Sequence, residues 1–98
     1  MAQLIIRVKE IKGECPVHSL GDEIVIDGPE IDLKRTDKIC IHALSPILHY
    51  AVALMEGIDP GKLGLSKKND FAYIHCPDPG EPYTHGGEVI FEIERVAD

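Results

Sequence analysis

Four stretches of the chain carry the hydrophobic pattern of β-strands, over residues 4–11, 23–26, 71–76 and 88–96. The first, LIIRVKEI, alternates apolar and charged residues from Ile6 onward, which predicts a strand with one solvated face. The last stretch likewise places Val89, Phe91 and Ile93 on one face and its charges largely on the other. The glycine-bounded stretch GECPVHSLGD, residues 13–22, separates the first two, so we expect a hairpin with a wide connection.

One helix is predicted over SPILHYAVALMEG, with Ser45 as its cap, Pro46 in its first turn and Gly57 at its end. Its apolar face has the three-four spacing of an amphipathic helix and comprises Ile47, Leu48, Ala51, Leu54 and Met55. The preceding ICIHAL is either a separate turn or a kinked extension of the helix, because Pro46 lacks one helical donor.

These elements predict a single α+β domain over residues 1–98, with a small, mostly antiparallel sheet of about four strands and one principal helix. Residues 27–38 have no clear period and are expected to form an exposed loop. The Pro- and Gly-rich stretch PDPGEPYTHGG is expected to be irregular.

Composition and charge narrow the classes of partner. The chain carries a net charge of −7 and has no tryptophan, so it lacks the basic surface that nucleic-acid binding requires. No apolar run approaches the roughly 20 residues that span a bilayer. The N-terminal MAQLIIRVKE lacks the basic start of a signal peptide. We therefore expect a cytoplasmic protein that binds neither nucleic acid nor membranes.

Three cysteines, Cys15, Cys40 and Cys76, are the strongest chemical feature of the sequence. Their odd number and wide spacing disfavour a disulfide framework. All three fall at the ends of predicted elements, where side chains from distant segments can converge. Cys40 precedes the helix, whose dipole favours a thiolate at that end.

The three thiols and His18, which follows Cys15 by three residues, form a candidate Cys₃His metal site. The set fits tetrahedral zinc, and it also fits an iron–sulfur cluster with one non-cysteine position. Proline follows Cys15 and Cys76, as in ferredoxin-type cluster segments, and no CxxC pair is present, so the pattern favours an iron–sulfur cluster. His18 is either a ligand or a neighbour of the site, and buried metal-free thiols are the simpler alternative.

The remaining histidines and acids are expected to be structural. His42 and His49 are predicted to face solvent or an interface, and His75 and His85 to belong to the loop region near Cys76. Asp22 is assigned to a turn, and Asp78 to the loop after Cys76.

The order of motifs resembles a family of small three-cysteine proteins without assigned function that is common in anaerobic bacteria and archaea. The resemblance spans nearly the whole chain and is carried by IKGECP, GDE, ICIHA, LSP, CPDP and FEIER, which begin at residues 11, 21, 39, 44, 76 and 91. It implies that Cys15, Cys40 and Cys76 are the three cysteines of the family. The chain is shorter than the family pattern between the first cysteine and the Gly-Asp turn. An anaerobic distribution is compatible with an oxygen-sensitive cluster.

Four functions follow from these features. The favoured one is a small iron–sulfur metalloprotein that transfers electrons to a redox partner protein or binds a small ligand. The alternatives are a structural zinc domain and a metal-free interaction or regulatory module that forms homo-oligomers through its edge strands. A thiol enzyme that uses Cys40 or Cys76 with a nearby histidine is the fourth, supported only by residue types. The sequence leaves open whether the protein is an enzyme.

Overall fold

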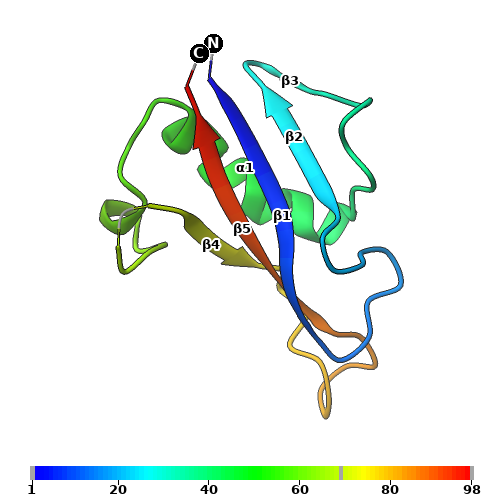
Figure 1. Cartoon of the computed structure of the whole chain (residues 1–98). Coiled ribbons are helices and arrows are strands. Elements are labelled where there is room, and N and C mark those ends of the chain that lie inside the picture. The colour runs from blue at the N-terminus through cyan, green and yellow to red at the C-terminus, as the bar shows by residue number, and fades with distance from the viewer. Residues whose placement is uncertain (1, 69, 98) are drawn as a thin grey trace.

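Five antiparallel strands form one sheet in the order β3-β2-β1-β5-β4 (Figure 1). The structure is a computed structural model that describes residues 2–68 and 70–97. The strands are β1 (Gln3–Lys12), β2 (Glu23–Asp27), β3 (Glu30–Ile31), β4 (Ala72–His75) and β5 (Glu88–Val96). The α+β class with a mostly antiparallel sheet is confirmed, with five strands where about four were predicted.

The additional strand is β3, which lies within the stretch predicted to be a loop. It pairs with β2 through Ile26–Ile31 and Asp27–Glu30, across a tight turn at Gly28 and Pro29. A strand of two residues is too short to show an alternating pattern. The predicted β1–β2 hairpin with its wide connection is confirmed.

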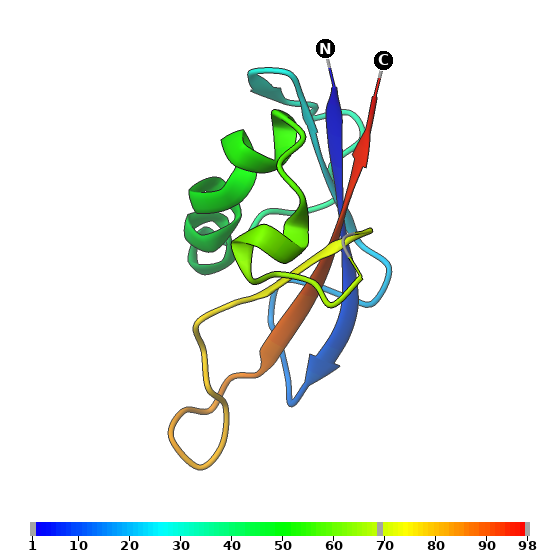
Figure 2. The ribbon, with the colours of Figure 1, turned by 90° about the vertical axis from the view of Figure 1, so that its left-hand side faces the viewer.

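Helix α1 (Ile41–Met55) covers one face of the sheet, and a short 3₁₀ helix, η1 (Pro60–Leu63), follows it (Figure 2). The helix begins at Ile41 with Cys40 as its N-cap, so the prediction that Ser45 caps the helix was wrong. Pro46 lies inside the helix, where it removes one hydrogen bond. Within the described part of the chain, no helix is both long and apolar enough to cross a membrane.

Four helical residues face the sheet, and they explain why the helix starts early. They are Ala43, Ile47, Ala51 and Leu54. Their three-four spacing begins at Ala43, so the helix gains a buried contact by starting before Pro46. Leu48, which was predicted on this face, is exposed instead.

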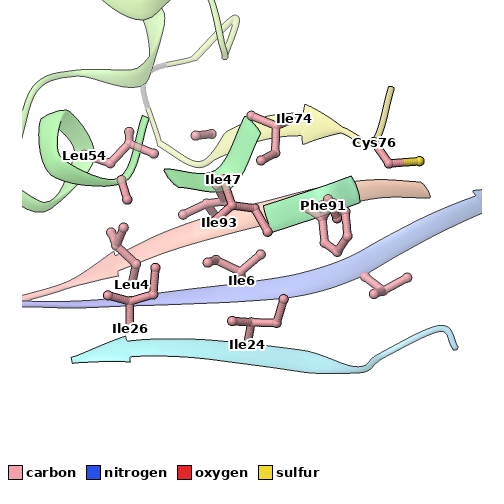
Figure 3. Packing of buried hydrophobic residues seen from close by; sticks show 14 of the residues in the cluster. Leu4, Ile6, Ile24, Ile26, Ile47, Leu54, Ile74, Cys76, Phe91 and Ile93 are labelled. Carbon is pink, nitrogen blue, oxygen red and sulfur yellow. The ribbon is translucent and has the colours of Figure 1, made fainter. Parts of the chain in front are cut away.

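The core lies between α1 and the sheet, and its side chains come from alternate strand positions (Figure 3). The largest fully buried ones include Leu4, Ile6, Ile24, Ile47 and Phe91. The expected face of β5 is confirmed, because Val89, Phe91 and Ile93 are buried, and Ala72 and Ile74 of β4 are buried with them.

The opposite face of the sheet carries a row of ion pairs. Arg7 on β1 contacts Glu23 on β2 at 2.7 Å and Glu94 on β5 at 3.0 Å. Lys9 lies 3.5 Å from Glu92. These cross-strand pairs help to set the strand register and place part of the acidic charge of the chain beside cations.

Candidate functional site

Three segments that are distant in the sequence enclose one small cavity. They are the β1–β2 connection (13–22), the N-terminus of α1, and the end of β4 with its following loop (76–87). All three cysteines line the cavity, which has a volume of about 210 Å³. Figure 1 shows the two loops at the end of the sheet opposite to the chain termini.

A close backbone contact at Gly87 joins two of these segments. A Cβ atom on Gly87 would lie 2.7 Å from the backbone N of Glu14 and 2.7 Å from the carbonyl O of Lys12. A side chain does not fit at such distances, so the two backbones pack directly against each other only because residue 87 is glycine. This contact holds the turn that carries Cys15 against the loop that follows Cys76.

Cys40 enters the cavity from the beginning of α1. It is the N-cap residue, and its side chain makes no capping hydrogen bond. Its carbonyl accepts a hydrogen bond from the backbone N–H of Leu44 at 3.0 Å. The thiol therefore belongs to the positive end of the helix dipole and is not used to cap it.

His18 links the cysteine of the first turn to the cysteine of the helix. The backbone N–H of His18 donates to Sγ of Cys15 at 3.3 Å. The backbone N–H of Cys40 donates to Nε2 of His18 at 3.4 Å. Two of the three cysteine segments are thus connected through one histidine.

The imidazole of His18 is buried and incompletely paired. Only 4% of the residue is exposed, and its ring meets that of Phe91 edge-on, with centroids 5.3 Å apart. Because Nε2 accepts a hydrogen bond, the neutral ring carries its proton on Nδ1. Nδ1 is buried and has no hydrogen-bond partner among the described residues. Such an orphaned donor costs about 1–3 kcal/mol and is uncommon in a structural position.

Burial also decides the charge of His18. Removal from water lowers the pKa of His18, Asp22 opposes this shift, and Lys38 adds to it. The ring is therefore neutral near pH 7. A neutral imidazole is the form that can bind a metal or donate a single hydrogen bond.

Cys76 is the most buried of the three cysteines and lies next to Phe91 at the end of the core (Figure 3). Its Sγ accepts a hydrogen bond from the backbone N–H of Val89 at 3.3 Å. The thiol donates to the carbonyl of Gly87 at 3.6 Å. A metal at Cys76 would replace the thiol proton and leave the Val89 contact in place.

The four predicted ligands share a cavity without converging on one point. In the described part of the chain, no three His, Cys, Asp or Glu side chains are arranged to hold a metal ion. Tetrahedral sulfur ligands of one zinc, each about 2.3 Å from it, stand about 3.8 Å apart. The thiols line a space larger than one ion, so a single-ion site would require the segments to close.

Two further cavity residues were not predicted. His42 and Asp78 both line the cavity. Hydrogen bonds from the Thr84 hydroxyl and, at 2.9 Å, from the Gly80 N–H lower the pKa of Asp78, and the nearby charge of His42 adds to this. An ionised carboxylate therefore stands beside the thiols. The available signal was spacing, since each residue follows a cysteine by two positions.

The other three histidines lie outside the cavity. The ring of His49 packs against Tyr50, with centroids 4.7 Å apart. Nδ1 of His75 lies 2.8 Å from the carbonyl of Cys76, and Nδ1 of His85 lies 3.3 Å from Glu81. These contacts are local, so only His18 and His42 among the histidines belong to the site.

No protein-family model, curated protein or solved structure matches this chain. The resemblance to the three-cysteine family therefore stays a prediction.

Proposed function

We propose that this chain is a small metalloprotein in which Cys15, Cys40 and Cys76 bind an iron–sulfur cluster. The observation that carries the proposal is that thiols from three distant segments line one cavity. Cysteine thiolates are the usual ligands of such clusters. A bound cluster would supply electron transfer, and an iron without a cysteine ligand would offer a position for a small molecule.

The size of the cavity favours a group of several atoms over a single ion. Its volume of about 210 Å³ is several times the roughly 30 Å³ that one water molecule occupies in the liquid. In a [4Fe–4S] cluster each cysteine binds a different iron, so the thiolates stand farther apart than around one zinc ion. The three thiols line one cavity but do not converge on one point, so they fit the ligands of such a cluster better than the ligands of a single zinc ion.

Each thiolate would have a positive partner in the backbone. The N–H groups of His18 and Val89 donate to Cys15 and Cys76, and Cys40 lies at the helix N-terminus. Such contacts offset the charge that three thiolates would bring to an acidic chain. Hydrogen bonds to ligand sulfurs also set the reduction potential of a cluster.

The hydrogen bonds favour His18 as a donor to the bound group over His18 as a ligand. Ligation through Nε2 would break the bond from the Cys40 N–H, whereas the Nδ1 proton has no partner among the residues that the structure describes. His18→Asn keeps a donor near the Nδ1 position, and His18→Gln keeps only the acceptor near Nε2. We expect both variants to retain iron and the Gln variant to show the lower reduction potential. Loss of iron from both would identify His18 as a ligand.

Anaerobic purification, followed by reconstitution with iron and sulfide, tests the main proposal. We expect a brown protein whose visible absorption bleaches on reduction, with iron and sulfide in comparable amounts. Cys15→Ser, Cys40→Ser and Cys76→Ser should each lower the bound iron, while His49→Asn outside the cavity should not. A colourless, iron-free protein after reconstitution would contradict the proposal.

A second candidate is a zinc-binding or metal-free interaction module. The packing of all three cysteines in or against the hydrophobic core favours it, as does the hydrogen bond from the Cys76 thiol to Gly87. A zinc domain should hold about one zinc per chain and unfold when a chelator removes it. A metal-free module should contain no metal, and its thiols should react with a thiol reagent only after denaturation.

We also propose a cytoplasmic location, because three unpaired thiols persist most readily in a reducing compartment. A redox partner protein or a small ligand would be the partner of the site. Membership of the three-cysteine family of anaerobes is part of the same proposal. Visible absorption of cells that overproduce the protein without oxygen would test whether the cluster forms there.

A further inference from the structure

Helix α1 is largely apolar around its circumference, although the sheet covers only one side. Its sequence, IHALSPILHYAVALM, contains no Asp, Glu, Lys or Arg, whereas 28% of the whole chain is charged. Ala43, Ile47, Ala51 and Leu54 are the residues buried against the sheet. A helix that is apolar on all sides is normally buried on all sides.

The uncovered side carries a stripe of large aliphatic residues. Ile41 is 79% exposed, Leu48 51% and Val52 73%. Spacings of seven and four residues place them on one side of the helix, and we call these three residues the α1 stripe. A groove of about 620 Å³ adjoins the stripe and is lined by Leu48, Val52 and Met55 together with Ile26 and Ile31.

The sheet edges are less suited to association than the helix. Strand β3 has only two residues, so it offers few free backbone groups. On β4, the N–H of Tyr73 already donates to the carbonyl of Leu65 at 2.8 Å. Pairing through edge strands, which the sequence suggested for an interaction module, therefore has little free backbone to use.

We propose that the α1 stripe and its groove form the interface of a homodimer, in which two copies of α1 pack antiparallel about a two-fold axis. A second copy fits as the occupant because α1 has an exposed cation, Lys38, before one end and an exposed carboxylate, Glu56, after the other. Two chains of net charge −7 repel each other, so their contact must avoid opposed carboxylates. Helix α1 contains no Asp, Glu, Lys or Arg, and Arg95 lies with Glu30 and Glu56 in the lining of the groove. The dimer would cover the three residues of the α1 stripe on each chain.

An axis near Leu48 makes the two ends of the interface complementary. Ile41 then packs against Met55 of the partner subunit, and Lys38 lies near Glu56 of the partner subunit. Lys38 precedes the helix and Glu56 follows it, and both are exposed. The antiparallel arrangement also sets the positive end of each helix dipole beside the negative end of the other.

Sedimentation velocity over a range of concentrations tests the interface on the whole chain. The wild type should shift from one to two chains per particle as concentration rises. Val52→Lys should raise the dissociation constant at least about tenfold, since dimerisation would bury an unpaired ammonium. The matched control is Leu20→Lys, because Leu20 is 67% exposed but lies in the β1–β2 connection. This variant should dimerise like the wild type.

The charges at the helix ends test the orientation. Glu56→Lys should weaken the dimer by up to about fivefold, and adding Lys38→Glu should restore it. A wild-type protein that stays monomeric at millimolar concentration would overturn the proposal. Equal dimerisation of the Val52→Lys and Leu20→Lys proteins would also overturn it. Failure of the Glu56→Lys and Lys38→Glu pair to compensate would reject the antiparallel orientation.

Discussion

The core under α1 and the cysteine cavity adjoin each other but consist of different kinds of side chain. Apart from Cys76, the core consists of aliphatic and aromatic side chains from regular elements, all buried in one cluster. The cavity is formed by loops and element ends, and it contains thiols, a buried imidazole and a carboxylate. Cys76 belongs to both regions, because it is part of the core cluster and lines the cavity. The ring of Phe91, in the core, contacts that of His18.

The two regions differ in how burial affects the stability of the fold. In the core every side chain gains from removal from water. In the cavity Nδ1 of His18 is buried and finds no partner in the described part of the chain, which costs stability. Such local departures from the rules of packing and pairing are typical of functional sites, and this one lies beside Cys15 and Cys40.

Truncation of a core residue should produce the largest loss of stability. Leu54→Ala removes a buried side chain of α1 and should lower the free energy of unfolding by about 2–5 kcal/mol. Leu33→Ala makes the same chemical change at an exposed position and should cost about 0.5 kcal/mol or less. Urea unfolding of the metal-free protein measures both. Similar losses in the two variants would contradict the assignment of stability to the core.

A methyl group at Gly87 should disturb the cavity more than the core. The new Cβ would lie 2.7 Å from backbone atoms of Lys12 and Glu14, so the two segments must move apart. We expect Gly87→Ala to lower the free energy of unfolding by about 1–3 kcal/mol and to reduce iron binding. Gly21→Ala is the control, since its φ is +85° but no atom lies within 4 Å of the added methyl. It should lose some stability and keep its iron binding.

Alternating patterns predicted the core strands because burial on one face leaves a period of two in the sequence. Residues 88–96 match β5 in full, and the alternation at 71–76 identified β4. The sequence left open whether ICIHAL extends the helix, because Pro46 lacks one helical donor, and the structure shows that α1 begins at Ile41 within this stretch. The spacing from Ala43 to Ile47 favours this extension. Tertiary burial outweighed the hydrogen bond that proline removes.

The candidate site could be predicted only in part, because it depends on contacts between distant segments. The positions of Cys15, Cys40 and Cys76 at element ends indicated where they lie, and the structure brings them to one cavity. Their use as ligands stays a prediction. The burial of His18 depends on its contacts with Phe91 and Cys40, which no local pattern encodes.

The pH dependence of stability should show the effect of the buried His18 in the cavity. Burial lowers the pKa of His18 in the folded protein, so the unfolded chain binds this proton first as pH falls. The contribution is fully present above the unfolded value of about 6.5 and is lost as pH falls toward the folded value. His18 can change the free energy of unfolding by at most about 1.4 kcal/mol per pH unit. Wild-type stability should therefore fall more steeply below pH 6.5 than that of His18→Gln, and parallel curves would contradict the burial of a neutral ring.

Replacement of Cys15 should have the smallest effect on stability and a large effect on iron. The residue is half-buried, and a serine oxygen can accept the hydrogen bond from the His18 N–H in place of the sulfur. We therefore expect Cys15→Ser to change the free energy of unfolding of the metal-free protein by about 0.5 kcal/mol or less. After reconstitution, the iron per chain should fall well below that of the wild type. Large destabilisation with unchanged iron would show that Cys15 acts as a core residue and not as a ligand. The cavity would then not differ from the core in the way its residues contribute to stability.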